Sequence, residues 1–253
     1  MITLISKYSK KILLASSLLF FTDITFAKGM PKEYYKIKDT DKSKKYFFDY
    51  IYNMVEQENI KILNERKFVK SILNSNILSL NFSSIQFKKL LEIKKRYRVK
   101  NIYTYSEYSK KIDIVPPSQA LAQAAIESGW GKSRFIKEAN NIFGHWTYNP
   151  RIGMLPKRRE IEATHFIRVF KSLQDSISAY MLNLNRNNAY KNFRKKRFEF
   201  RVNNKQLDGF ALSQTMINYS GIAHEYLDIL KNVIKTNNLT NYDTYFYTNL
   251  NTK

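Results

Sequence analysis

Apolar residues in the first half of the chain recur at the three- to four-residue spacing of amphipathic helices. No glycine or proline interrupts this pattern between Pro31 and Pro116. Such a segment favours helices throughout, and we expect residues 28–110 to form a helical N-terminal subdomain that packs on the rest of the chain. The predicted helices cover residues 47–63, 68–73 and 85–97.

The pattern changes in the second half, which contains six of the seven glycines. Aromatic and β-branched residues dominate residues 143–148 and 164–170, and this composition predicts two short strands. Residues 149–159 between them are basic and include glycine and proline. We therefore expect a small β-hairpin lobe with a mobile basic tip.

Helical signals return after the predicted hairpin. Ser172 and Asp175 have the spacing of a capping box, which predicts a helix over residues 173–185, and apolar spacing predicts further helices over 206–217 and 222–235. The expected fold is mostly α-helical with a small β-hairpin lobe. Its expected units are the helical segment 28–110, a main domain over 111–236 and a disordered Asn/Thr/Tyr-rich tail over 237–253.

The N-terminus has the pattern of a secretory signal. Three lysines precede an apolar run over residues 12–21, and small residues follow near Ala27. A run of about ten residues is too short to cross a bilayer of roughly 30 Å as a helix. We expect a signal peptide over residues 1–27 and export to the periplasm or cell wall, with a retained N-terminal anchor as the alternative.

Composition excludes several kinds of chemistry. The chain has no cysteine, so it has neither disulfides nor a thiol nucleophile. Its formal charge of +22 favours an acidic partner such as a wall polymer, although a general compositional bias toward lysine explains the charge equally well. No nucleic-acid-binding module is recognisable. One basic cluster would either contact an acidic polymer or form a solvated helix face: Lys191, Arg194, Lys195, Lys196, Arg197 and Arg201.

One carboxylate has an informative position, because Glu127 lies at the C-terminal end of a predicted helix of small residues. Pro116 and Pro117 pre-set the entry to this helix, and Ser118 is its expected N-cap. Gly129 can adopt the left-handed conformation that ends a helix. The Glu127 carboxylate is therefore expected at a fixed position on a helix end, and not on a flexible loop.

The surroundings expected for Glu127 favour its protonated form. Gln123 and either Ala120 or Ala124 share its helix face, and these small alanines leave room for a ligand. The negative end of the helix dipole and a nearby indole such as Trp130 would both raise the pKa of the carboxyl group. A carboxylic acid that keeps its proton can protonate a leaving sugar oxygen. The alternative is an ordinary solvated glutamate.

The longer motif favours the catalytic interpretation. Residues 124–131, Ala-x-x-Glu-Ser-Gly-Trp-Gly, and residues 140–144, Asn-Asn-Ile-Phe-Gly, resemble the bacterial glucosaminidase family of peptidoglycan hydrolases. The Pro-Pro-Ser-x-Ala-Leu-Ala-Gln-Ala helix at 116–124 is similar to the Bax-type branch of that family. The likeness extends over about residues 45–234. Further matching segments are 48–51, 55–59, 179–185, 219–220 and 225–226.

The resemblance implies a lysozyme-like, mostly helical fold with a β-hairpin lobe, and a role for individual residues. Glu127 matches the catalytic acid, which protonates the glycosidic oxygen on the reducing side of N-acetylglucosamine. Tyr219 matches a tyrosine of the cleft that is important for activity. Trp130 and Trp146 are candidates for stacking on sugar rings or for core packing. The substrate-binding candidates are Gln123, Trp130, Asn141, Phe143, Trp146 and Tyr180.

A second catalytic group is not evident, because the expected hairpin tip over residues 149–159 contains no acid. Glu160 and Glu162 are the nearest candidates and would share one strand face. Asp113, just before the Glu127 helix, is another. In a further route the substrate's own acetamido oxygen attacks, and no enzyme base is needed. The solvated strand edge is the alternative role for Glu160 and Glu162.

Other chemistries lack their sequence signals. His224 and Glu225 have no second histidine at zinc-protease spacing, and no nucleotide-binding fingerprint occurs, so we expect neither a metal nor a cofactor. The expected partner is the glycan strand of peptidoglycan. Two rival functions remain: a lytic transglycosylase, whose usual Gly-Leu-Met-Gln continuation is absent here, and a non-catalytic cell-wall-binding protein on the same fold.

Overall fold

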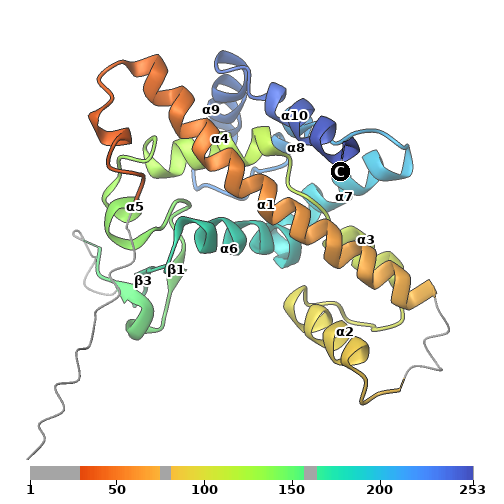
Figure 1. Cartoon of the computed structure of the whole chain (residues 1–253). Coiled ribbons are helices and arrows are strands. Elements are labelled where there is room, and N and C mark those ends of the chain that lie inside the picture. The colour runs from red at the N-terminus through yellow and green to blue at the C-terminus, as the bar shows by residue number, and fades with distance from the viewer. Residues whose placement is uncertain (1–28, 75–80, 157–163, 253) are drawn as a thin grey trace, which may run out of the picture.

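The computed structural model of the chain describes residues 29–74, 81–156 and 164–252. These residues form a set of helices and one three-stranded antiparallel sheet (Figure 1). The expectation of a mostly α-helical fold with a small β lobe is confirmed. The expected signal peptide over residues 1–27 lies outside the described residues.

The elements follow one another along the chain with short connections. The helices are α1 (Thr40–Asn74), α2 (Ile85–Arg96), α3 (Tyr105–Lys111), α4 (Pro117–Ser128), α5 (Arg134–Ala139), α6 (Leu173–Arg186), α7 (Lys191–Val202), α8 (Gly209–Ser213), α9 (Ala223–Thr236) and α10 (Thr240–Asn251). The strands are β1 (Trp146–Thr147), β2 (Gly153–Met154) and β3 (Phe166–Arg168). Short 3-10 helices are η1 (Tyr34–Lys36), η3 (Pro150–Ile152) and η4 (Asn188–Tyr190).

Helix α4 lies at the centre of the fold. It contacts α1, α8, α9 and α10, and Figure 1 shows α1 crossing it. All of its residues except Ile126 and Glu127 are buried, and many are alanines. Small side chains let the surrounding helices pack closely against the α4 backbone. The helix that ends at the candidate acid is therefore held on several sides.

Helix α1 is a single long helix, whereas the pattern predicted two. Phe47, Ile51, Val55, Ile62 and Val69 form one buried stripe along it, each at most 2% exposed. The polar turn in the middle of α1 contains no residue that breaks a helix, so the hydrogen bonds continue through it. The helix thus supports α4 and α6 at once.

Helices α3 and α5 have no counterpart among the predictions, and α7 corresponds only to the helix face considered for the basic cluster. The first two are short, and the buried face of α7 is formed by Phe193, Arg194 and Arg197. An apolar periodicity is weak where arginines occupy the buried positions. Helix α8 is shorter than the predicted helix over 206–217 and begins after its N-cap Asp208.

The sheet has the order β1-β3-β2, so the predicted hairpin is extended by a third strand. Trp146 pairs with Ile167, and Gly153 pairs with Arg168. The third strand lies in the segment expected to be a mobile tip. Gly153 permits this pairing, because a Cβ atom there would lie 2.5 Å from the Cβ of Phe166.

The expectation of a disordered C-terminal tail is wrong. Residues Thr240–Asn251 form α10, and Phe246 on this helix is completely buried. Asp243 accepts hydrogen bonds from the backbone N–H (2.8 Å) and hydroxyl (2.6 Å) of Ser118. Ser118 is therefore not the N-cap of α4, which begins at Pro117. A side chain from a distant helix caps the free N–H group instead.

Candidate active site

A long cleft of about 1250 Å³ runs between the helices and the β lobe. Its walls come from α1, the end of α2, the end of α4, the segments around β1 and β3, and the whole length of α6. In Figure 1 the β lobe and α2 lie apart from each other below α6.

No helix within the described parts of the chain is long and apolar enough to cross a membrane.

Glu127 lines this cleft at the C-terminal end of α4. Gly129 has φ of 54°, so the predicted left-handed helix end is confirmed. The hydroxyl of Ser128 donates to the carbonyl of Ala124 (2.6 Å) and accepts the N–H of Gly131 (2.8 Å). These contacts close the turn that follows Glu127, and the carboxyl group sits on a rigid element.

A chain of buried hydrogen bonds orients the carboxyl group. The Tyr226 hydroxyl donates to Oε1 of Glu127 (2.8 Å) and accepts from Nε2 of Gln123 (3.2 Å). The Tyr180 hydroxyl donates to Oε1 of Gln123 (2.6 Å). Each hydroxyl has one proton, so the amide of Gln123 fixes the direction in which Tyr226 donates. The other Glu127 oxygen, Oε2, makes no hydrogen bond to the described residues and is free to carry a proton.

The surroundings raise the pKa of Glu127. Burial is the larger effect and favours the neutral acid, and the hydrogen bond from Tyr226 opposes it in part. Burial raises the pKa of Tyr180, Tyr190 and Tyr219, and the negative charge of Glu127 raises it further. The carboxyl group is thus surrounded by neutral phenols.

The predicted role of Trp130 near Glu127 is not what the structure shows. Trp130 packs edge-on against Phe47 and Phe48, with ring centroids 6.2 and 5.4 Å away, and the ammonium of Lys44 lies 5.4 Å from its ring. Its φ of 57° follows the left-handed Gly129 and turns the indole toward α1. Trp130 is a packing residue, and tyrosines take the place expected for the indole.

Three predicted residues line the same cleft as Glu127. Tyr219 lines it and stacks on Tyr226, with ring centroids 5.6 Å apart. Phe143 is nearly buried and stacks on Tyr180 at 3.9 Å. Trp146 is 62% exposed on β1 and leaves one face open, because its other face stacks on His165 at 4.0 Å. An exposed indole at the rim of a cleft suits a sugar ring.

Three other predicted contacts are buried behind the cleft and do not reach it. Gln123 is completely buried and Tyr180 is 1% exposed, so both act through Tyr226. Asn141 is also 1% exposed: its amide donates to the carbonyls of His145 (2.9 Å) and Arg168 (2.8 Å). Asn141 therefore ties the segment after α5 to β3. In each case buried polar groups satisfy one another.

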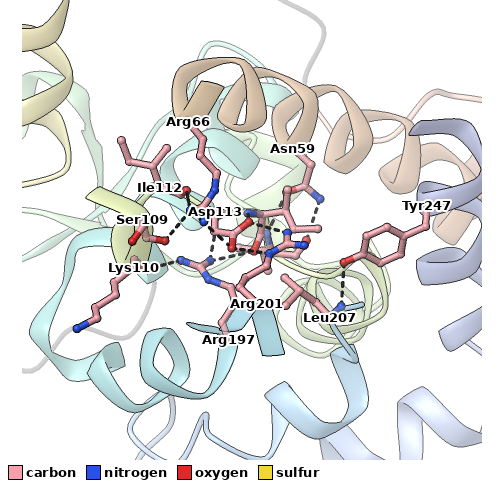
Figure 2. Close-up of polar contacts among 12 residues, drawn as sticks. Asn59, Arg66, Ser109, Lys110, Ile112, Asp113, Arg197, Arg201, Leu207 and Tyr247 are labelled. Atoms are coloured by element: carbon pink, nitrogen blue, oxygen red, sulfur yellow. Dashed lines mark hydrogen bonds and ion pairs between the residues drawn. The ribbon is translucent and has the colours of Figure 1, made fainter. Parts of the chain in front are cut away.

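Asp113 is wrong as a candidate base, because it is only 1% exposed and bound by arginines (Figure 2). Nε and an Nη of Arg201 donate to its two oxygens (2.9 and 2.8 Å), and Arg66 forms a longer ion pair (3.8 Å). Burial by itself would raise the pKa of Asp113. The hydrogen bonds of Arg201 and the charges of Arg197, Arg201 and Arg66 outweigh it and lower that pKa.

The basic cluster of α7 is therefore neither wholly solvated nor wholly available to a polymer. Arg197 is 1% exposed and donates to the carbonyls of Asp113 (3.0 Å) and Ile114 (2.9 Å), and burial lowers its pKa to about 9. Arg194 is 7% exposed and donates to the carbonyl of Leu184 (2.8 Å). These arginines pair with backbone oxygens inside the protein.

Two further carboxylates, Glu58 and Asp175, line the described part of the cleft, and a serine hydroxyl donates to each. Glu58 accepts from the Ser178 hydroxyl (2.6 Å), and Asp175 accepts from the Ser172 hydroxyl (3.0 Å) at the start of α6. Glu160 and Glu162 lie outside the described residues. Within the described ranges, histidine and acidic side chains form no group that could hold a metal ion.

Sequence reasoning missed two residues of the site. Tyr226 belongs to the apolar stripe of α9, where its spacing indicated only packing. Tyr190 follows α6 in a 3-10 turn and lines the cleft. The match of residues 225–226 to the family motif was the one available signal for Tyr226.

A partly exposed carboxylic acid with a raised pKa, set in a long cleft of a mostly helical protein, is the arrangement of a glycosidase general acid. The chain belongs to the glucosaminidase family, described as mannosyl-glycoprotein endo-beta-N-acetylglucosaminidase, whose model matches residues 102–239. Family membership supports glycosidase activity on a glycan that contains N-acetylglucosamine.

One curated relative is protein bax of Escherichia coli (strain K12). It is 29% identical over 192 residues, which cover 74% of this chain and 67% of that protein. No solved structure matches the chain. The resemblance to the Bax-type branch is thus confirmed, and the alignment is longer than the matched family domain.

Proposed function

We propose that this protein is an exported peptidoglycan hydrolase that cleaves the glycan strand on the reducing side of N-acetylglucosamine, with Glu127 as the general acid. The observation that carries the proposal is the state of Glu127. Its carboxyl group is partly buried, its pKa is raised, and the Tyr226 hydroxyl donates to one of its oxygens. Its other oxygen is left to donate a proton to the leaving sugar oxygen.

The proposed first step transfers the Glu127 proton to the glycosidic oxygen as the bond to the anomeric carbon breaks. The anionic carboxylate then accepts a hydrogen bond from Tyr226, which stabilises the charge that has formed. Positive charge develops on the sugar ring, next to the phenols of Tyr190 and Tyr219. Trp146 provides the open aromatic face on which a neighbouring sugar stacks.

The second step requires a group that attacks the anomeric carbon. Glu58 and Asp175 are held by serine hydroxyls in the cleft, so they are poor candidates. The attacking group is then the substrate's acetamido oxygen, or a water activated by Glu160 or Glu162. Loss of activity in Glu160→Gln or Glu162→Gln would identify the second route, and full activity in both would support the first.

A lytic transglycosylase is the second candidate, and one observation favours it. Such an enzyme needs a single carboxyl group, and Glu127 is the one carboxyl of the described cleft that no serine hydroxyl holds. The products separate the two functions. Hydrolysis produces ordinary reducing ends, whereas transglycosylation produces anhydro-muramyl ends.

Export is part of the proposal and rests on the sequence of residues 1–27, with its lysines, apolar run and small residues. The periplasm or cell wall is where a peptidoglycan hydrolase would meet its substrate. Determination of the N-terminal residue of the protein after expression tests cleavage at Ala27.

The decisive experiment incubates the purified protein with peptidoglycan sacculi beside a Glu127→Gln variant, and identifies released fragments by mass spectrometry. We expect the native protein to release fragments with N-acetylglucosamine at the reducing end, and the variant to release almost none. No release by the native protein would favour the non-catalytic wall-binding function. Equal release by the variant would remove Glu127 from the mechanism.

A finer test concerns the aromatic rim. Trp146→Ala should raise KM and lower kcat/KM by roughly two- to tenfold, because one stacking contact is lost. Tyr148 is 74% exposed on the same segment and does not line the cleft, so Tyr148→Ala is the matched control. An equal loss in both variants would mean that the lobe was disturbed as a whole.

A further inference from the structure

The part of the cleft along β3 and the end of α6 contains cations that have no acidic partner. Arg168, Lys171 and Arg186 all line the cleft, and none forms an ion pair within the described residues. The other two cations of the cleft differ, because Arg96 pairs with Glu65 and Lys61 pairs with Glu58. The cleft therefore has a net positive section, which is where an anion would be stabilised.

The two arginines are held in place from opposite sides of this section. The Arg168 guanidinium lies 4.5 Å from the ring of Phe170, and its Nε is buried without a hydrogen-bond partner among the described residues. Arg186 comes from the last turn of α6 and donates to the backbone carbonyl of Arg96 (3.3 Å).

The electrostatics agree with this geometry. Burial lowers the pKa of Arg186, and the positive charges of Arg98 and Arg168 lower it further. Like charges that approach one another in a partly buried site destabilise the protein until an anion compensates them. Arginine also presents a planar fork of donors that fits a carboxylate in a bidentate manner.

The position of these arginines restricts the anion that they could bind. They line the same cleft as Glu127, so a glycan strand bound at Glu127 would bring its own anionic groups, or those attached to it, to these arginines. A strand of N-acetylglucosamine alone is uncharged. Peptidoglycan carries carboxylates on the lactyl ether of every second sugar or, where that group is amidated, on the attached peptide.

We propose that Arg168 and Arg186 bind a carboxylate of the peptidoglycan strand and thereby select peptidoglycan over uncharged glycans. This proposal rests on the proposed function and specifies its substrate. Arg168 and Arg186 are then specificity residues, and Lys171 at the rim of the same section adds to the attraction.

The test measures binding rather than cleavage, so that it does not depend on turnover. The Glu127→Gln protein is titrated with three soluble ligands of equal sugar number: uncharged N-acetylglucosamine oligomers, peptide-free peptidoglycan fragments, and fragments that carry their peptides. We expect the fragments with carboxylates to bind about tenfold more tightly, and this preference to weaken as salt is added. Tight binding of the peptide-free kind alone identifies the lactyl carboxylate, which the peptide-bearing kind lacks, and tight binding of the peptide-bearing kind alone identifies a peptide carboxylate. Tight binding of both kinds means that the arginines accept either carboxylate.

Two added substitutions locate the effect. On the Glu127→Gln background, Arg168→Gln and Arg186→Gln should each remove most of the preference for charged fragments. Lys195→Gln is the matched control, because Lys195 is exposed on α7, outside the cleft, and loses the same charge. Arg168→Lys keeps the charge and should retain part of the preference, which separates binding from a loss of folding.

Two outcomes overturn the proposal. Equal affinity for charged and uncharged ligands, independent of salt, would contradict the carboxylate proposal. If the native protein still cleaved sacculi, the proposed function would stand. Failure of every ligand to bind, together with no cleavage, would remove both proposals.

Discussion

Two carboxylates lie near the two ends of helix α4, and their pKa values are shifted in opposite directions. Asp113 lies just before its start and is buried, whereas Glu127 lies near its end and is partly buried. The pKa of Asp113 is lowered, and that of Glu127 is raised. Burial acts in the same direction on both, so the partners decide the outcome. Arginines surround Asp113, whereas Glu127 has a single phenolic donor.

The difference separates a structural acid, Asp113, from the proposed general acid, Glu127. Asp113 connects α1 and α7 through Arg66, Arg197 and Arg201, and its ionised form is part of the fold. Glu127 receives less compensation than a buried anion needs, so its neutral form is favoured. A site that keeps an acid protonated gives up some stability for function.

The largest expected effect is on catalysis at Glu127. In Glu127→Gln the rate of glycan cleavage should fall by roughly 10²- to 10⁴-fold, because the proton donor is lost. The free energy of unfolding should stay the same or rise, since a poorly compensated carboxyl group is removed. Assays of sacculi digestion and urea unfolding measure the two quantities. Glu92→Gln, an exposed change on α2, is the control and should alter neither.

Asp113→Asn should show the reverse behaviour. We expect the free energy of unfolding to fall by about 3–5 kcal/mol, because three arginine charges lose their buried partner. Urea unfolding followed by circular dichroism measures the loss, with the exposed Asp228→Asn as the control. A change within about 0.5 kcal/mol would mean that the arginines are satisfied by backbone carbonyls alone.

Removing the one donor to Glu127 should sharpen the contrast further. Tyr226→Phe deletes the hydrogen bond that lowers the pKa of Glu127, so the alkaline limb of kcat/KM should move to higher pH. The rate itself should fall by roughly tenfold, because the carboxyl group loses its orientation. Tyr245→Phe, at a residue 54% exposed on α10, is the control. A lower rate with an unmoved pH profile would make Tyr226 a packing residue only.

The smallest expected effect is on how stability depends on pH, and its sign differs between the two acids. Asp113 contributes stability that is present above its ordinary pKa of 3.8 and is lost as the pH falls through its lower folded value. Glu127 contributes stability that is present below 4.5 and is lost as the pH rises through its higher folded value. The free energy of unfolding should be measured across the acid and neutral pH range. We expect Glu127→Gln to remove the loss of stability with rising pH and to leave the loss at low pH, which comes from Asp113, unchanged.

Local sequence signals predicted much of the fold correctly. Helical spacing, the N-cap at Ser172 and the left-handed Gly129 depend on neighbours a few residues away, and the structure has all of them. The errors have a common cause. The C-terminal tail has a composition typical of disorder, yet Phe246 is buried in the core and Asp243 caps α4. Amino-acid composition does not indicate which surface of the folded protein a segment packs against.

The site was predicted less completely than the fold. Glu127, Tyr219, Phe143 and Trp146 line the cleft, whereas Trp130, for which sugar stacking and core packing were both open, packs on α1. The direction of the pKa shift of Glu127 was predicted, but the groups that surround the acid are tyrosines. Spacing along a helix predicts which residues share its face, and it does not predict what lies opposite that face.

The sequence by itself determined that a helix of small residues ends at Glu127, and that this end belongs to the glucosaminidase motif. Only the tertiary structure decided which acid could act, because Tyr226 meets Glu127 across 99 positions and Arg201 meets Asp113 across 88. The physical reason is that a pKa depends on the charges and solvent within a few ångströms, and folding alone brings those groups together.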